Sequence, residues 1–297
     1  SDEVLITNGV SEAIDLSLRA FINPEDEVIL PEPAYVCYRP LIELCDGIPI
    51  TLDTSKTAFV PTANDIESLI TPKTKLIILS YPNNPTGQSI DFNELEAIAE
   101  LALNHNILIM TDEIYADLSF DSFRSIATIK KLKDQLIYLN GFSKGHSMTG
   151  WRVGYVCANE NYIEAMNKIH QYSSLCAPTL SQYAAIEAYR NTFSDLRLMM
   201  ESYQKRAQFF TKMMNSVGLD TIMPKGGLYC FSSIKNLSMT SLDFAQSLLK
   251  KSQVAVVPGS VFGKSGEGYF RSCIATDFND LKLAANKIID FVKAYDK

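Results

Sequence analysis

Asn140-Gly-Phe-Ser-Lys144-Gly-His-Ser-Met-Thr-Gly-Trp-Arg152-Val-Gly-Tyr155 is the stretch from which we interpret the rest of the chain. It follows an apolar run at 136–139 that is typical of a strand, and it places Lys144 among glycine, serine and threonine. A lysine at a strand end among small residues reaches into a cleft without steric competition, and its amine can form an imine with an aldehyde. An isolated lysine in such a place is usually only solvated, so the surrounding motifs decide between the two interpretations.

The composition is that of an ordinary globular protein. The chain has 297 residues, 46% hydrophobic and 21% charged, which is enough for one large or two modest domains. Its formal net charge of −7, without a block of like charges, argues against nucleic-acid or anionic-membrane partners. Six scattered cysteines without a C-x-x-C pair, and three histidines, argue against a metal site or a disulfide framework. With neither a leader nor a membrane-spanning run, we expect a cytoplasmic protein.

Apolar runs alternate with helical periodicity over the first two thirds of the chain. The predicted strands cover 4–6, 27–30, 75–80, 108–111, 136–139 and 153–158, and the predicted helices cover 11–21, 92–104 and 161–172. Asp91 and Glu94 have the spacing of a capping box for the second helix. The alternation predicts an α/β fold with a mostly parallel sheet between helices, and ligands at the carboxyl ends of the strands.

The last third of the chain has a different pattern. A long helical stretch at 193–217 is followed by predicted strands near 228–232, 254–257 and 269–273, and by helices that begin at Leu242 and Asp280. We therefore predict a large domain over residues 1–195. A smaller C-terminal α+β domain over residues 196–297 would include the linking helix.

Polar motifs follow several of the predicted strands, and each is weak evidence alone. Thr7-Asn-Gly9-Val10-Ser11 joins a strand to a helix start, where free N–H groups favour an anion, although most such starts are only N-caps. The turn Asn83-Asn84-Pro85-Thr86-Gly87 follows another strand. Asp112, in Thr111-Asp112-Glu113-Ile114-Tyr115, is a carboxylate after a buried run, which is unfavourable unless the charge is paired. Arg271, on a C-terminal strand, can bind a carboxylate through two parallel bonds.

Taken in order, these motifs resemble those of the class I/II aminotransferases, fold-type-I enzymes that use pyridoxal 5′-phosphate. The Ser-Lys-x-x-x-x-x-Gly-Trp-Arg-x-Gly-Tyr pattern is similar to the segment that holds the cofactor in that family. The resemblance covers essentially the whole chain. It extends to the bacterial aminotransferase A group, often called N-acetyl-L,L-diaminopimelate aminotransferases. Family members carry a further segment before the point where this sequence begins, so we expect a chain that lacks its N-terminal part.

The resemblance implies a role for each motif. The implied catalytic residues are Lys144, which holds the cofactor as an imine and moves a proton, Asp112 at the pyridine nitrogen, and Tyr115 at the phenolic oxygen. The implied cofactor-binding residues are Val10, Ser11, Tyr35, Asn84, Asp112, Tyr115, Ser143, Lys144 and Arg152. Arg271 would bind the substrate carboxylate, with Asn84 also at the substrate. Many relatives have a phosphate-binding serine where this chain has Gly141, and Ser143 is the residue expected to compensate.

We therefore predict a homodimeric aminotransferase that moves an amino group between an L-amino acid and a 2-oxo acid. The resemblance implies N-acetyl-L,L-diaminopimelate or aromatic amino acids as candidate substrates. Aspartate-type enzymes bind a dicarboxylate with a second arginine well after the lysine, and this chain has no arginine between Arg152 and Arg190, which argues against that mode of recognition. A β-lyase of the cystathionine type stays open, since substrate orientation decides which bond is cleaved. A non-enzymatic regulator domain that binds the cofactor also stays open, although no basic stretch supports DNA binding. A further alternative is an inactive fragment of such an enzyme.

Overall fold

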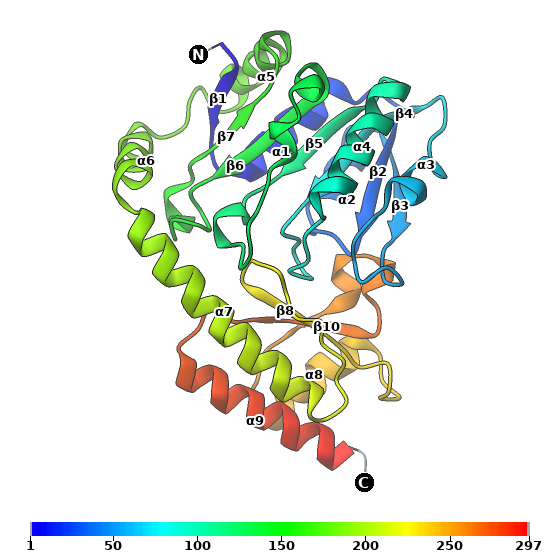
Figure 1. The fold of residues 1–297 in the computed structure, drawn as a ribbon, viewed down its shortest axis with the longest axis vertical. Helices are drawn as coiled ribbons and strands as arrows, with labels where there is room; N and C mark the ends of the chain where they lie inside the picture. The colour runs from blue at the N-terminus through cyan, green and yellow to red at the C-terminus, as the bar shows by residue number, and fades with distance from the viewer. Residues whose placement is uncertain (1, 296–297) are drawn as a thin grey trace.

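Seven strands form the central sheet of the computed structural model, which describes residues 2–295 (Figure 1). Their bounds are Val4–Thr7 (β1), Glu27–Glu32 (β2), Ile48–Asp53 (β3), Thr74–Ser80 (β4), Leu108–Asp112 (β5), Leu136–Gly141 (β6) and Gly154–Cys157 (β7). They lie in the order β1-β7-β6-β5-β4-β2-β3. The pairs from β3 to β6 are parallel, whereas β7 is antiparallel to both of its neighbours. The carboxyl ends of six strands and the amino end of β7 therefore share one edge of the sheet.

Helices cover both faces of this sheet. The nine helices of the described residues are Val10–Phe21 (α1), Tyr38–Glu43 (α2), Ala63–Glu67 (α3), Phe92–His105 (α4), Glu160–Ser173 (α5), Thr179–Asn191 (α6), Phe193–Asn215 (α7), Ser241–Ser252 (α8) and Phe278–Tyr295 (α9). Side chains alternate between the two faces along each strand. In β2, Val28 and Leu30 belong to the core shared with α1, while Ile29 between them belongs to the core shared with α4. The central strands are therefore apolar on both faces.

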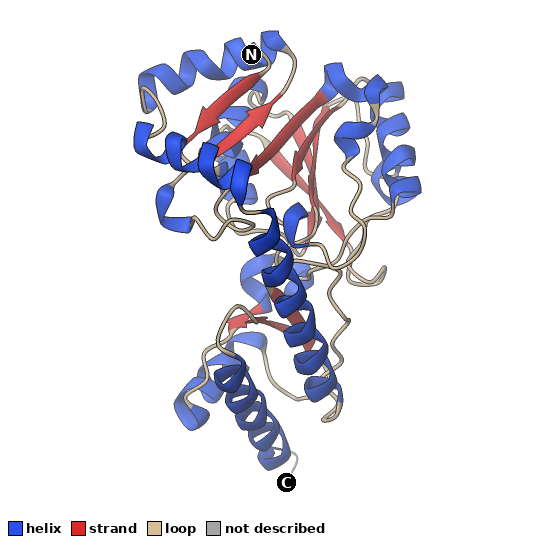
Figure 2. Cartoon of the chain, turned by 60° about the vertical axis from the view of Figure 1, so that its left-hand side comes forward, coloured by secondary structure: helices blue, strands red, loops and turns tan. Residues whose placement is uncertain are grey.

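A smaller unit at the C-terminal end lies below the sheet in Figures 1 and 2. Its antiparallel strands are Tyr229–Ser233 (β8), Val257–Pro258 (β9) and Tyr269–Cys273 (β10), in the order β8-β10-β9. Phe210 of α7, Phe244 of α8 and Ile288 of α9 pack with Phe270 of β10 in one buried cluster. Because the buried apolar residues of α7 from Ala207 onward belong to this cluster, we propose that α7 from residue 196 onward is part of the C-terminal unit, with the boundary at 195/196.

The predicted fold class is confirmed, and most predicted elements lie within a few residues of the observed ones. The capping box is wrong: Asp91 precedes α4 but its side chain makes no cap bond, and the Glu94 carboxylate instead accepts a hydrogen bond from the Ala63 N–H at 2.6 Å. The strand predicted at 254–257 is reduced to Val257–Pro258. The elements that the sequence analysis missed are β3, α3 and α6. The sequence also predicts a helix that opens at Pro33-Ala-Tyr35 after the second strand, and the observed helix there, α2, begins at Tyr38. Among residues 2–295, no helix combines the length and apolar character needed to cross a membrane.

Candidate active site

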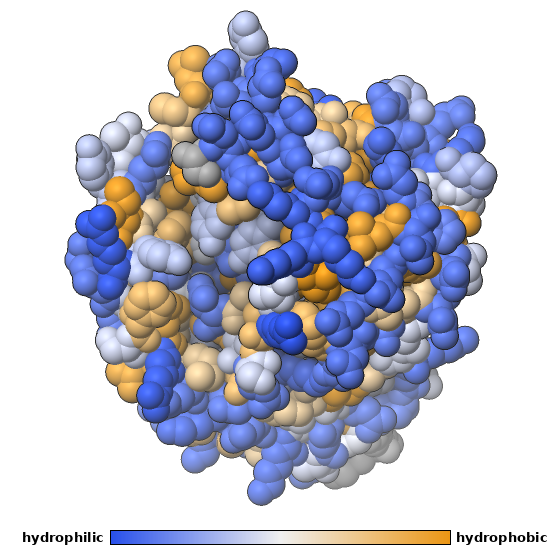
Figure 3. Space-filling view, turned by 45° about the horizontal axis from the view of Figure 1, so that its top comes forward, coloured by the Kyte–Doolittle hydropathy of each residue, from blue (hydrophilic) through white to orange (hydrophobic). Residues whose placement is uncertain are grey.

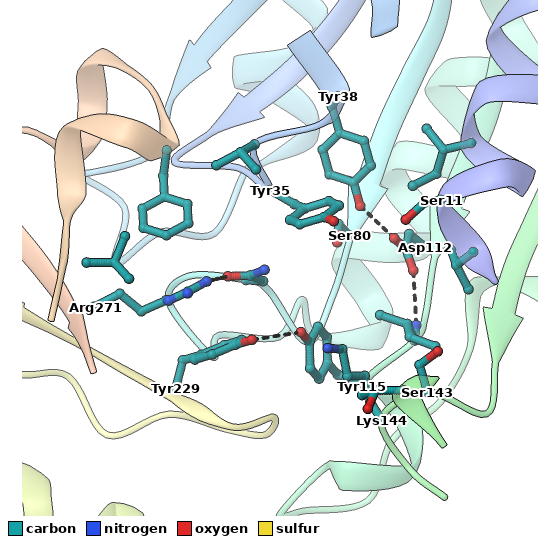
Figure 4. Close-up of a pocket in the computed structure, with 18 of the residues that line it drawn as sticks. Ser11, Tyr35, Tyr38, Ser80, Asp112, Tyr115, Ser143, Lys144, Tyr229 and Arg271 are labelled. Atoms are coloured by element: carbon teal, nitrogen blue, oxygen red, sulfur yellow. Dashed lines mark hydrogen bonds between the residues drawn. The ribbon is translucent and has the colours of Figure 1, made fainter. Parts of the chain in front are cut away.

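A cavity of about 520 Å³ opens at the shared edge of the large sheet, with the small unit on its other side. Every site residue predicted from the sequence lines it: Val10, Ser11, Tyr35, Asn84, Asp112, Tyr115, Ser143, Lys144, Arg152 and Arg271. Apart from Arg271, which comes from β10 of the small sheet, these residues lie beside strand ends that share one edge of the large sheet, and the topology therefore brings them together. Figure 4 shows this cavity and its labelled side chains.

Asp112, the last residue of β5, supplies a buried carboxylate. It is 4% exposed, accepts a 2.7 Å hydrogen bond from the Tyr38 hydroxyl and accepts a 3.1 Å bond from the Ile114 N–H (Figure 4). Burial raises the pKa of Asp112 to about 6, and the two hydrogen bonds and the charge of Lys144 oppose that rise. The cavity therefore presents an acidic group whose negative charge favours a nearby cation or N–H donor.

Tyr38 is a site residue that the sequence analysis missed. It is fully buried at the start of α2, where burial and the neighbouring Asp112 raise its pKa well above the ordinary value. Its ring contacts Tyr35 edge-to-face, with 5.7 Å between the ring centroids. The only signal in the sequence was the three-residue spacing between the two tyrosines, which places both on one side of a helical turn.

Lys144 lies three residues after the end of β6 and extends into the cavity beside Tyr115 (Figure 4). Its amine nitrogen lies 6.0 Å from the centroid of the Tyr115 ring. The Tyr115 hydroxyl donates to the hydroxyl of Tyr229, which lies on β8, at 3.4 Å. Tyr229 is a second lining residue that the sequence analysis did not identify. The amine, the buried carboxylate of Asp112 and these hydroxyl groups thus surround one space.

The start of α1 lies at one end of the cavity, where its residues Val10 and Ser11 line the wall with Arg152. Gly9 is the N-cap residue with φ 74°, and no described side chain caps the helix, so the first backbone N–H groups of α1 have no such partner and are free to bind an anion. Arg152 lies over Gly9: its Nη2 donates to the Asn8 carbonyl at 3.3 Å, and its Nη1 donates to the Thr149 carbonyl at 3.0 Å. The φ of 74° favours glycine at position 9, and a Cβ there would also lie 2.4 Å from Nη2, so the Arg152 side chain would have to move.

The structure also explains the glycine at position 141. A Cβ on Gly141 would lie 2.8 Å from the Cα of Gly154 and 3.0 Å from the Val153 carbonyl, because β6 and β7 approach closely there. A serine at this position would therefore require the strands to separate. Ser143, two residues later, lines the cavity instead.

The small unit contributes Arg271, which lies on β10. Its Nη1 donates to Asn84 Oδ1 at 2.7 Å, and its guanidinium carbon lies 4.1 Å from the Tyr229 ring and 4.8 Å from the Phe262 ring (Figure 4). Its Nε is buried without a partner among residues 2–295. A planar guanidinium held this way can still bind the two oxygens of a carboxylate. The adjoining wall is apolar and contains Val36, Val257, Val261 and Phe262.

This set of donors and acceptors fits pyridoxal 5′-phosphate. The uncapped helix start and Arg152 suit a phosphate, the Asp112 carboxylate suits a protonated pyridine nitrogen, and Lys144 suits an aldehyde. Arg271 stays available for a substrate carboxylate at the opposite side of the cavity.

Comparisons with known proteins agree with this chemistry. Residues 1–288 match the family model "Aminotransferase class I and II". A Bacillus subtilis protein named "Probable N-acetyl-LL-diaminopimelate aminotransferase" is 44% identical over 291 residues, which cover 98% of this chain and 74% of the relative. The crystal structure of an aromatic aminotransferase from Pyrococcus horikoshii OT3 superposes with a TM-score of 0.95 at 35% identity, covering 98% of this chain and 79% of that one. A Thermotoga maritima aspartate aminotransferase gives a TM-score of 0.92 at 35% identity, covering 98% and 76%.

Proposed function

The chain belongs to the class I and II aminotransferase family, and on that premise we propose a role for each residue of its cavity. It is a pyridoxal-phosphate-dependent aminotransferase, which exchanges amino groups between amino acids and 2-oxo acids. The β-lyase and regulator alternatives are not favoured, because the named relatives are aminotransferases. The observation that supports the assignment of roles is that Lys144, Asp112 and Arg152 line one cavity at the edge where the strands end.

We assign one part of the cofactor to each group of residues. Val10 and Ser11, at the start of α1, would bind the phosphate together with Arg152 and Ser143. Tyr35 would lie against the ring. Asn84 already accepts the bond from Arg271 through its Oδ1, so its amide N–H groups are left to donate to the phenolic oxygen, to which Tyr115 would also donate.

Bound pyridoxal phosphate supplies an electron sink that stabilises negative charge at the substrate α-carbon. Asp112 would maintain that property by accepting a hydrogen bond from the pyridine N–H, and its burial would keep water from competing with that bond. The Lys144 amine acts as general base and then general acid, because its Nζ extends into the cavity from a fixed strand end. Arg271 holds the substrate α-carboxylate and so fixes which bond at the α-carbon faces Lys144.

We propose that the preferred side chains are aromatic or otherwise apolar. The cations that line the cavity are Lys144, Arg152 and Arg271, and each has a role in the scheme above. None is left within the described lining to pair with a distal carboxylate. Val257, Val261 and Phe262 supply an apolar wall beside Arg271. A higher kcat/KM for phenylalanine than for aspartate would support this preference, and the reverse order would exclude it.

We propose that the protein is a homodimer through the exposed face of α6. Leu180, Tyr183 and Tyr189 are 81%, 70% and 62% exposed along this helix, and Phe193 follows at 65%. In Figure 3, hydrophobic patches reach the surface on several sides, including the left-hand side, where α6 lies in Figure 1. Apolar side chains clustered in this way mark interaction surfaces.

Light scattering over a dilution series tests the dimer. Tyr183→Glu should lower the apparent mass by placing a charge in the interface. Leu242→Glu, at a 50% exposed position on α8, is the matched control and should leave the mass unchanged. A wild-type protein that stays monomeric at every concentration would refute the proposal.

A cytoplasmic location is also part of the proposal. All six cysteines are free thiols, which suits a reducing compartment. Fractionation of the native cells would test it. We expect small-molecule amino acids and 2-oxo acids as the partners of the site.

Lys144 provides the test of the proposed function. Borohydride reduction of the protein with bound cofactor, followed by peptide mapping, should place the cofactor mass on Lys144. Lys144→Ala should slow amino transfer on the order of 10⁴-fold, because it removes the general acid–base group. Lys168→Ala changes a 70% exposed lysine on α5 and should keep full activity. Cofactor mass on another lysine would overturn the assignment.

A further inference from the structure

Glu12 lies in the first turn of α1, next to Ser11, and its carboxylate is turned away from the cavity. The side chain is 12% exposed and is not among those that line the cavity. One oxygen, Oε2, accepts a 2.5 Å hydrogen bond from the Asn8 backbone N–H. The other, Oε1, accepts a 2.5 Å bond from the Ser174 hydroxyl and lies 3.1 Å from Nδ1 of His170. The carboxylate therefore connects the strand-to-helix loop with the end of α5.

The backbone at Asn8 is held from two directions. Glu12 accepts from its N–H, while Arg152 donates to its carbonyl at 3.3 Å. The next residue, Gly9, has φ 74° and is followed by the uncapped start of α1. The orientation of these consecutive peptide groups determines where the first N–H groups of the helix point. Glu12 and Arg152 thus fix the loop at residues 7–11, which we call the phosphate loop.

The other end of this connection is rigid. His170 is 4% exposed in its side chain and lies in the last turn of α5, which packs against α1. A second contact between these helices joins Ser17 Oγ and the Met166 sulfur at 3.4 Å. Burial disfavours the charged form of Glu12, but the hydrogen bonds from Asn8, Ser174 and His170 outweigh it and lower the Glu12 pKa. Glu12 therefore stays ionised at neutral pH.

The negative charge of Glu12 distinguishes two possible roles, which are direct attraction of a phosphate and positioning of the backbone. A carboxylate close to a phosphate site repels the phosphate, so direct electrostatic attraction is excluded for Glu12. Its contribution must come from the geometry that it imposes on the backbone. A fixed loop binds its ligand with less loss of conformational entropy than a mobile one.

We propose that Glu12 is a positioning residue, which holds the phosphate loop against the end of α5 so that the N–H groups of α1 are set for the cofactor phosphate. The inference rests on the proposed function, because the phosphate site at this loop is part of that proposal. It implies that a substitution at Glu12 weakens the binding of a ligand that carries a phosphate and does not change the binding of a ligand that lacks one.

Two ligands that differ only in the phosphate test this inference. Cofactor-free protein is titrated with pyridoxal 5′-phosphate and, separately, with pyridoxal, and each Kd is measured from the change in absorbance. Glu12→Ala should raise the Kd for pyridoxal phosphate about tenfold, which corresponds to the loss of one hydrogen bond to a charged group. The Kd for pyridoxal should not change. Glu12→Gln should have a smaller effect than Glu12→Ala. The glutamine amide has one oxygen, which can still accept at one of the two positions where the carboxylate accepts hydrogen bonds, whereas alanine accepts none.

Asp15→Asn is the matched control. Asp15 lies one turn further along α1 and pairs with Arg19 at 2.8 Å near the surface, so both Kd values should stay at the wild-type level. If Glu12→Ala fails to fold, Ser174→Ala removes one donor to Oε1 and should raise the Kd for pyridoxal phosphate alone. Equal weakening of both ligands, or no weakening, would overturn the inference.

A parallel titration of Arg152→Ala distinguishes failure of this inference from failure of the proposed function. If Arg152→Ala selectively weakens the binding of pyridoxal phosphate and Glu12→Ala does not, the proposed role of Glu12 is wrong and the assignment of the phosphate site stands. If Arg152→Ala does not weaken pyridoxal phosphate selectively, the assignment of the phosphate site itself is wrong.

Discussion

The two walls of the cavity are built differently. On the large-unit wall, Asp112 and Arg152 each bond to protein groups that fix their positions. On the small-unit wall, Arg271 has one bond to Asn84 and a buried Nε without a described partner, beside the exposed side chain of Val261. The first wall suits a ligand that is always the same, and the second suits ligands that vary. The cofactor is constant and the amino acid is exchanged in each half of the reaction, so the difference matches the two tasks.

The two walls also differ in the backbone elements that carry their side chains. The large-unit groups lie at the ends of strands in a seven-stranded sheet, where packing on both faces restricts movement. Val261 and Phe262 lie instead in a short 3-10 helix, Gly259–Phe262, next to the two-residue strand Val257–Pro258. Sites on regular elements hold their geometry more accurately than sites on short connections. We therefore expect changes to the large-unit wall to have the larger effects.

Of the substitutions that compare the two walls, Asp112→Asn should have the largest effect. An amide preserves the shape but cannot stabilise a protonated pyridine nitrogen, so the rate of amino transfer should fall on the order of 10³-fold, as when a preorganised electrostatic group is removed. Single-turnover kinetics would measure it. Cofactor binding should persist, because the phosphate contacts lie elsewhere. A near-normal single-turnover rate would show that this wall does not supply the charge stabilisation.

The same carboxylate should make stability depend on pH in the cofactor-free protein. Burial raises the pKa of Asp112 from 3.8 to about 6, so the folded state holds its proton more tightly than the unfolded state. That contribution is complete below the unfolded pKa and is lost as the pH rises through about 6. A shift of roughly two pKa units corresponds to about 3 kcal/mol.

Urea unfolding of the wild type and of Asp112→Asn tests this dependence. From about pH 4 to pH 7, the unfolding free energy of Asp112→Asn minus that of the wild type should grow by up to about 3 kcal/mol. Glu113, whose pKa burial raises to about 7, titrates in both proteins, and only the smallest cause of its shift, the charge of Asp112, differs between them. Parallel pH curves for the two proteins would contradict the buried-carboxylate argument.

Much of the large-unit wall could be predicted from the sequence, because apolar runs followed by polar residues identify strand ends. The pairing of Tyr38 with Asp112 could not, since these residues are 74 positions apart and meet only through the strand order. The edge strand β3 was missed because its alternating residues are partly exposed and give no continuous apolar run. The prediction of a capping box was wrong because the Glu94 carboxylate accepts a hydrogen bond from Ala63, which lies outside α4 and is distant in the sequence.

Replacing Arg271 or Arg152 by lysine should have different effects, because the two residues lie on different walls of the cavity. Arg271→Lys replaces a planar pair of donors by a point charge, so KM for the amino acid should rise about 10- to 100-fold, as expected for one lost charge-assisted bond. The Kd for the cofactor should stay the same. Arg152→Lys should do the opposite and weaken the cofactor. Steady-state kinetics and cofactor titration measure the two effects, and identical phenotypes would remove the distinction between the arginines.

The smallest effect should come from Val261→Ala, which tests the apolar part of the small-unit wall. Val261 is 47% exposed, so truncation leaves no closed void, and the fold should keep its stability. The change removes two methyl groups, only part of whose surface a substrate ring would cover, so kcat/KM for phenylalanine should fall about threefold to tenfold. For alanine, whose side chain is too short to reach this wall, kcat/KM should stay the same. Leu283→Ala, at a 56% exposed position on α9, is the control for general effects of losing an exposed apolar side chain. If phenylalanine and alanine lost the same factor, Val261 would act on the shared part of the substrate, and the small-unit wall would not be the surface that selects the side chain.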